Sequence, residues 1–134
     1  MRDRAIRIGT EDARVELTYL GGGEWRVTAD WASALRADFT TALDDPEVGD
    51  FTARVLAGLR APHARVFDGR LTGGRNNPLH LTIERHGPSR LLLLAVLTPN
   101  GDDGTCLLRL ESGPVDAAEL EAAFAGLHRS VTGG

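Results

Sequence analysis

The chain contains no lysine and a single cysteine. All 15 of its basic residues are arginines, and they are scattered along the sequence instead of clustered. Such usage could reflect selection for bidentate contacts with carboxylates or phosphates, but the scatter favours genomic base composition as the cause. Because Cys106 is alone, no intrachain disulfide can form, nothing indicates an oxidising compartment, and we expect the protein in the cytoplasm.

A basic surplus and a long apolar segment are also missing. The formal net charge is −4, whereas nucleic-acid binding normally needs a basic patch, so we expect no nucleic-acid partner. The longest apolar run, residues 91–97, is far shorter than the roughly 20 residues that cross a bilayer. Too few apolar residues follow the charged start of the chain to make a signal peptide, so we expect neither secretion nor a membrane partner.

The remaining composition is that of an ordinary globular protein. Hydrophobic residues make up 42% and charged residues 25% of the 134 positions, which is enough to bury a core without disulfides or a metal. We find no internal repeat and no linker-like segment. The sequence therefore predicts one domain over residues 1–134.

The first half of the chain alternates between apolar and polar residues. Residues 13–19 and 25–31 follow this two-residue period on either side of three glycines, which predicts a β-hairpin. Trp25 and Trp31 share the parity of the apolar positions, so both are expected on the core face. Residues 31–43 fit both a strand and a four-residue helical spacing, and we favour a strand because the alternation stays in phase.

Two segments carry helix signals. Asp45 is the expected capping carboxylate of the first helix, with Pro46 at its first position, and that helix should end near residues 60–62. The second helix is expected to start after residues 112–114, with an apolar stripe that contains Leu120, Phe124 and Leu127.

Strands are expected between and beside these helices. Residues 65–71, 79–84, 91–97 and 105–111 have strand patterns, and the unbroken apolar run 91–97 predicts a strand that is covered on both faces. Residues 79–111 should form a three-stranded antiparallel meander with a turn at residues 100–104. The fold class is therefore α+β, with a single-layer, mainly antiparallel β-sheet of about six to seven strands and two helices, one mid-chain and one C-terminal.

No catalytic or metal-binding motif is recognisable, and no cofactor is implied. The histidines at 63, 80, 86 and 128 show no helical metal-ligand spacing, and Cys106 is expected to be a buried thiol in a strand. The densest acidic cluster is explained by the helix macrodipole at the start of the first helix. These observations favour a non-catalytic protein over an enzyme, with a hydrolase or isomerase as the third choice.

Two kinds of binding site remain open. The first is a protein-binding surface formed by the acidic helix start and the polar face of the sheet, with the candidate residues Asp44, Asp45, Glu47, Asp50, Arg26 and Arg36. The second is a small-molecule or anion site near the glycine-rich loop at residues 73–78, with the candidate residues Arg65, Arg70, Arg75 and His80. The sequence leaves open whether the chain is a monomer or a homodimer.

The order and spacing of these segments resemble a known family. The stretches at residues 24–29, 50–59, 67–71, 79–84, 91–97 and 119–120 resemble the WapI-type family of small bacterial immunity proteins and their uncharacterised actinobacterial relatives. This resemblance implies an antiparallel sheet with two helices and, for the characterised branch, neutralisation of a cognate toxin by binding. It implies no catalytic residues. The glycine-rich loop at 73–78 and the turn at residues 87–88 depart from the family pattern.

Overall fold

The chain folds as two similar runs, each of four strands followed by one helix. The computed structural model describes residues 4–74, 76–99 and 106–133. The elements of the first run are β1 (Ala5–Gly9), β2 (Ala13–Gly21), β3 (Glu24–Trp31), β4 (Leu35–Ala42) and α1 (Asp45–Leu59). Those of the second run are β5 (Val66–Arg70), β6 (Leu79–Arg85), β7 (Arg90–Leu97), β8 (Leu108–Asp116) and α2 (Ala117–Thr132).

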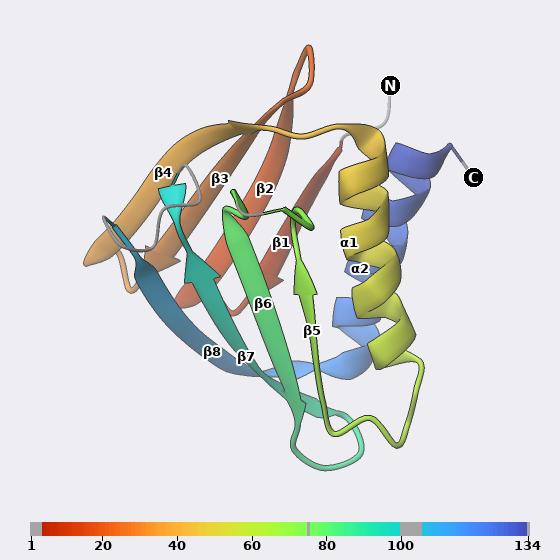
Figure 1. Cartoon of the computed structure of the whole chain (residues 1–134). Helices are drawn as coiled ribbons and strands as arrows, with labels where there is room; N and C mark the ends of the chain where they lie inside the picture. Colours follow the sequence, from red (N-terminus) through yellow and green to blue (C-terminus); the bar gives the residue numbers. More distant parts are fainter. Residues whose placement is uncertain (1–3, 75, 100–105, 134) are drawn as a thin grey trace.

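Each run of strands forms its own antiparallel sheet (Figure 1). Sheet A has the order β1-β2-β3-β4 and sheet B the order β5-β6-β7-β8. The α+β class with two helices is confirmed, whereas the expected single sheet of six to seven strands is wrong. Alternation shows which face of a strand is buried but not which strands pair, and β5 pairs with β6 instead of joining β4. Strand β1 escaped prediction because only Ile6 and Ile8 mark its buried face.

The hairpin and the strand after it are confirmed. Ala13 pairs with Trp31 across β2 and β3, and Trp31 pairs with Leu35 across β3 and β4. Trp25 is fully buried, but Trp31 is 50% exposed, so its expected place in the core is wrong. It stands at the end of β3, where its cross-strand neighbours are the small side chain of Ala13 and the exposed Leu35.

Both predicted helices are confirmed, with shifted starts. The N-cap of α1 is Asp44, one residue before the expected Asp45, and Glu47 completes a capping box with it. Helix α2 begins at Ala117 with Asp116 as its N-cap. Residues 112–114, which were expected to lead into this helix, instead belong to β8.

Three details of sheet B differ from expectation. In β7, Leu91, Leu93 and Leu97 are buried, but Leu92 on the opposite face is 36% exposed, so the strand is not covered on both faces. Strand β8 begins at Leu108 instead of residue 105, and Cys106 before it is exposed instead of buried. The antiparallel meander of β6, β7 and β8 is confirmed, and the turn expected at 100–104 lies outside the described residues.

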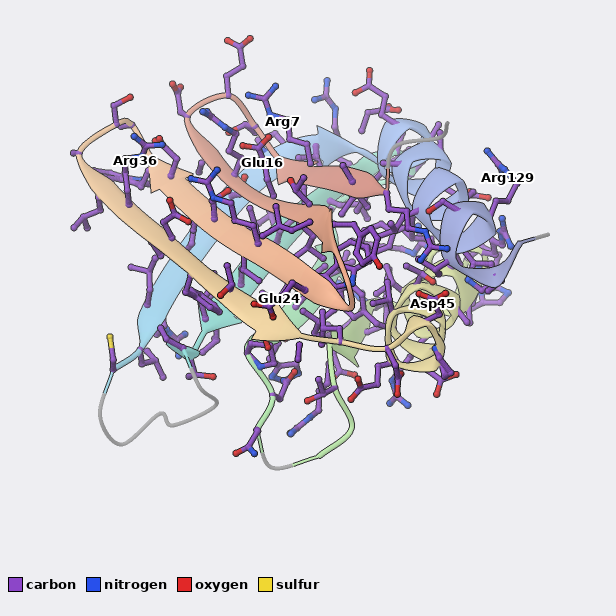
Figure 2. The ribbon with its side chains drawn as sticks, turned by 90° about the horizontal axis from the view of Figure 1, so that it is seen from above. Arg7, Glu16, Glu24, Arg36, Asp45 and Arg129 are labelled. Carbon is purple, nitrogen blue, oxygen red and sulfur yellow. The ribbon has the colours of Figure 1, made fainter. Side chains whose placement is uncertain are left out.

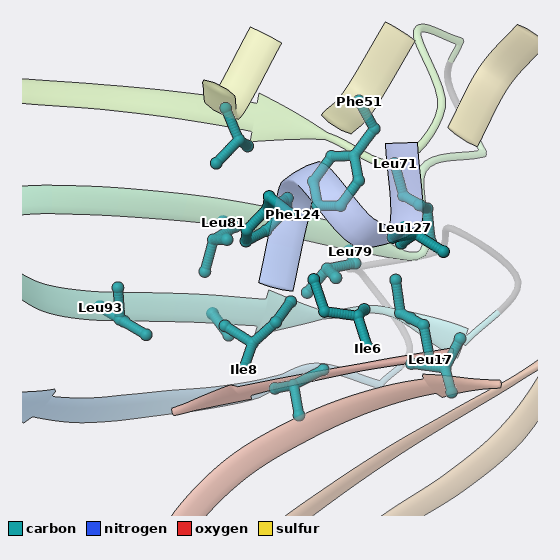
Figure 3. Close-up of a cluster of buried hydrophobic side chains, with 14 of the residues drawn as sticks. Ile6, Ile8, Leu17, Phe51, Leu71, Leu79, Leu81, Leu93, Phe124 and Leu127 are labelled. Carbon is teal, nitrogen blue, oxygen red and sulfur yellow. The ribbon is translucent and has the colours of Figure 1, made fainter. Parts of the chain in front are cut away.

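Each helix packs against a strand of the other run, and this packing joins the two runs. Helix α1 follows sheet A but packs on β5 of sheet B, whereas α2 follows sheet B and packs on β1 of sheet A as well as on β8. The two helices also pack against each other, and Phe51 of α1 meets Phe124 of α2 with their ring centroids 5.7 Å apart. Figure 3 shows these side chains between the two sheets, with Ile8 and Leu81 beside them. Both sheets and both helices thus contribute to one core cluster.

Candidate functional site

The side of sheet A that points away from the core carries side chains of both charges. We call this the outer face of sheet A; Figure 2 shows Arg7, Glu16, Glu24 and Arg36 spread over it. Its charged residues are Arg7, Arg14, Glu16, Glu24, Arg26, Asp30, Arg36 and Asp38. Apart from Asp30, all of them are exposed or half-buried. The face is therefore open to solvent and mixed in charge.

Ion pairs organise this face across neighbouring strands. Arg26 holds Asp38 with two hydrogen bonds, of 2.9 Å from Nε and 2.5 Å from Nη2. These bonds lower the pKa of Asp38 and raise that of Arg26. Asp30 lies 3.3 Å from Arg36 and 4.0 Å from Arg14, measured from its carboxylate to the guanidinium nitrogens. The charges thus compensate one another, which leaves a surface without a strong field of one sign.

The predicted protein-binding residues fall in two separate places. Arg26 and Arg36 lie on the outer face of sheet A, whereas the four acidic candidates lie at the start of α1. Figure 2 shows Arg36 and Asp45 far apart. The structure therefore does not combine the two groups into one surface.

Most of the acidic residues at the start of α1 have local partners. Asp44 Oδ1 accepts a hydrogen bond of 2.8 Å from the backbone N–H of Glu47, and Glu47 Oε1 accepts one of 2.9 Å from that of Asp44. Asp45 accepts a hydrogen bond of 2.7 Å from Arg4. Helix capping and a surface ion pair therefore account for the positions of three of the four carboxylates.

Asp50 borders a shallow cavity of about 310 Å³ between the start of α1 and the end of α2. His128 also lines it, and its Nδ1 lies 2.8 Å from Thr52 Oγ1. A hydroxyl beside an imidazole could serve as a nucleophile and its base. Thr52, however, is fully buried, and its hydroxyl also lies 3.0 Å from the carbonyl oxygens of Val48 and Gly49, so a substrate has no access to it.

A second cavity of about 310 Å³ lies where the two sheets meet. Ser112 of β8 lines it together with Asp12 and Glu111. The Ser112 hydroxyl donates a hydrogen bond of 2.6 Å to the carbonyl of Ala13 and accepts one of 3.2 Å from the backbone N–H of Thr10. This side chain therefore connects sheet B to the β1–β2 turn of sheet A, and its proton is not shared with a catalytic base.

The predicted anion site is only partly assembled. Arg70 pairs directly with His80 across β5 and β6, but Arg65 lies at the other end of β5, about five residues or roughly 16 Å away along the strand. Arg75 lies outside the described residues. Asp68 adds a negative charge to the cluster, because its Oδ2 lies 2.7 Å from His80 Nε2. That carboxylate opposes anion binding at His80.

The His80–Asp68 contact was not foreseen from the sequence. His80 bonds to the carboxylate, and Arg54 from α1 lies 3.7 Å from the same group. The hydrogen bond from His80 is the main cause that lowers the pKa of Asp68, and Arg54 and Arg70 add to it. The shared parity of Asp68 and Arg70 in one strand could have indicated this cluster, had the register of β5 on β6 been known.

The other titratable residues that the structure describes do not gather into a metal site. His86 Nε2 lies 2.5 Å from Glu84 Oε1, and both side chains are exposed. Within residues 4–74, 76–99 and 106–133, no group of three or more histidine, cysteine or acidic side chains is placed to hold a metal ion. Over the same residues, neither helix has the length and apolar character needed to cross a membrane.

Comparison with known proteins does not assign this chain to a family. No family model matches this chain, and no curated protein is similar enough to count as a relative.

Proposed function

We propose that this chain is a non-catalytic protein-binding module that uses the outer face of sheet A. The observation that carries this proposal is a wide sheet face that is solvent-exposed, mixed in charge and left uncovered by either helix. An open, solvent-exposed sheet face of this kind suits a protein partner better than a small molecule, which needs a concave pocket. Its balanced charges favour specificity for one partner over general attraction to a polyanion.

The resemblance to immunity proteins suggests the kind of partner. On that basis we propose a cognate toxin as the ligand and the cytoplasm as the place of encounter. An immunity protein acts by binding alone, which agrees with the inaccessible Thr52 hydroxyl and with the backbone-bonded Ser112.

Co-expression with candidate toxins encoded beside this gene tests the proposal. The wild-type chain should restore growth against one of them and co-purify with it. The charge reversals Glu16→Arg and Arg26→Glu on the outer face should reduce binding by about tenfold or more, because they place like charges against a complementary partner.

The matched control is Asp50→Arg, a charge reversal at the start of α1. It should leave rescue and binding unchanged. Loss of binding in this control but not in the two face variants would move the site to α1. Failure of every adjacent toxin candidate to be bound would contradict the immunity proposal.

A further inference from the structure

Among the residues that the structure describes, nothing covers the free edge of strand β4. It makes substantial contacts only with β3, whereas the other outer strands are covered: β5 by α1, β1 by α2, and β8 by contacts with β1 and β2. An edge strand presents unpaired N–H and C=O groups, which natural proteins usually protect with charged side chains, above all lysine, with proline or with an inward-pointing charge. The described edge from Leu35 to Ala42 has no proline or lysine, and its inward positions hold only uncharged side chains. Its two charges, Arg36 and Asp38, lie on the outer side and are opposite in sign.

Apolar side chains are exposed at the beginning of this edge. Trp31 is 50% and Leu35 is 57% exposed, and the two are direct cross-strand partners. The turn between them holds Ala32 and Ser33 at positive φ, 52° and 60°, which is unfavourable for residues other than glycine. Asp30 fixes this turn by accepting a hydrogen bond of 2.8 Å from the backbone N–H of Ser33. The fold thus holds an apolar pair at the open edge.

The sequence of β4 is complementary to itself in one register. If two copies pair antiparallel about Ala37, Arg36 of each faces Asp38 of the other on the outer side. On the inner side, Leu35 of each faces Phe39 of the other. A pairing centred one residue earlier or later keeps the same sides together but places Arg36 against Arg36 or Asp38 against Asp38, which is unfavourable. A slip of one residue, which moves the centre by half a residue, would instead reverse the inner and outer sides of one copy.

The same register continues the side-chain rows of sheet A. On the inner side, the existing pair Trp31–Leu35 would be followed by Phe39 and Val27 of the second copy. On the outer side, Asp30 and Arg36 would be followed by Asp38 of the second copy, so that charges alternate in sign. Arg36 can reach across, because its side chain is 70% exposed and has one partner, Asp30, among the described residues.

We propose that two copies of this chain pair edge to edge through β4, antiparallel and centred on Ala37. The two four-stranded A sheets then become one eight-stranded sheet. This interface is separate from the proposed binding of a different protein, because the outer face of sheet A stays open in the dimer. Failure of one proposal leaves the other intact, since self-association is measured on the purified chain and toxin binding on the mixture.

Sedimentation velocity of the purified full chain over a range of concentrations tests the dimer. The wild type should approach twice the 14.4 kDa mass of one chain. Arg36→Asp and Asp38→Arg should each raise the dimer dissociation constant by about tenfold or more, because both cross-strand pairs become like-charged. Circular dichroism should show that both variants remain folded, since both side chains are exposed.

Mixing the two variants is the decisive measurement. One then carries two acidic and the other two basic residues at positions 36 and 38, so the equimolar mixture should form heterodimers although each variant alone is monomeric. Arg7→Asp, a charge reversal on β1 of the same face, should leave the wild-type dimer unchanged. The proposal would be overturned by a monomeric wild type, by dimers that survive both reversals, or by a mixture that stays monomeric. It would also be overturned if the wild type paired through β4 only with a strand from another protein.

Discussion

At the scale of single residues, the carboxyl group of Asp68 shows how neighbouring side chains change a pKa. It accepts a hydrogen bond from His80 and lies near Arg54 and Arg70, and these contacts lower its pKa. A carboxyl whose pKa is lower in the folded than in the unfolded chain stabilises the fold above its unfolded value of about 3.9. This contribution is lost as the pH falls through the lowered pKa.

We therefore expect His80→Ala to raise the pKa of Asp68 toward its ordinary value. The variant should also lose less stability than the wild type between about pH 4 and pH 2, because the unfolded and folded pKa values then lie closer together. Carboxyl chemical shifts followed by NMR across that pH range measure the first effect, and urea unfolding at each pH measures the second.

His86→Ala is the matched control for this prediction. It removes an imidazole just beyond the same strand, but that ring bonds to Glu84 and not to Asp68. The Asp68 titration should not move in this variant. Identical Asp68 titrations in the wild type and in His80→Ala would contradict the expected role of the hydrogen bond.

At the scale of elements, periodicity in the sequence was enough to find seven strands and both helices. It could not show which apolar residues the core covers, because Trp31 at the end of β3 and Leu92 on the outer side of β7 continue an apolar pattern but are exposed. It also missed β1, where two isoleucines in five residues are too short a signal. Which apolar residues are buried depends on the neighbouring layer, and a single strand does not encode that layer.

Because α1 approaches β5 closely at Gly58, replacing this helical glycine with alanine should destabilise the protein instead of stabilising it. A Cβ added to Gly58 would lie 2.2 Å from the Phe67 ring of β5. Glycine to alanine in a helix normally stabilises by about 1 kcal/mol, but here overpacking costs about 1–3 kcal/mol. Gly58→Ala should therefore lower the free energy of unfolding by about 1 kcal/mol, measured by urea denaturation.

Gly49 provides the control in the same helix. Its added Cβ would meet only Thr132 Cγ2, at an ordinary contact distance of 3.5 Å. Gly49→Ala should stabilise by up to about 1 kcal/mol, opposite in sign to Gly58→Ala. Stabilisation by both variants would mean that α1 and β5 are further apart in solution than in the structure.

At the scale of the whole molecule, the arrangement of the sheets was beyond the reach of the sequence patterns. Hydrogen-bond partners between strands are long-range, and nothing in the local pattern of β5 excludes pairing with β4. The same limit applies to the candidate site. The polar face with Arg26 and Arg36 was predictable from alternation, but its separation from the acidic residues of α1 follows only from the placement of the helix.

Ser112 offers a test of how the two sheets are connected. Ser112→Ala removes its hydrogen bonds to Ala13 and Thr10 and should lower the free energy of unfolding by about 1–2 kcal/mol. Ser130→Ala is the control, because the Ser130 hydroxyl bonds to Leu127 within its own helix and to no other described residue. It should change stability by no more than about 0.5 kcal/mol. Equal effects of the two substitutions in urea unfolding would show that Ser112 does not tie the sheets together.

The exchanged packing of the helices has a consequence for synthesis of the chain. When the ribosome has completed the first four strands and α1, the strand on which α1 packs has not yet been made. The apolar stripe of α1 therefore stays exposed to solvent until β5 has been made, and β1 stays uncovered until α2 has been made. The native state is thus reached only when both halves of the polypeptide are present, and a nascent chain interrupted midway has no finished half to protect it from aggregation.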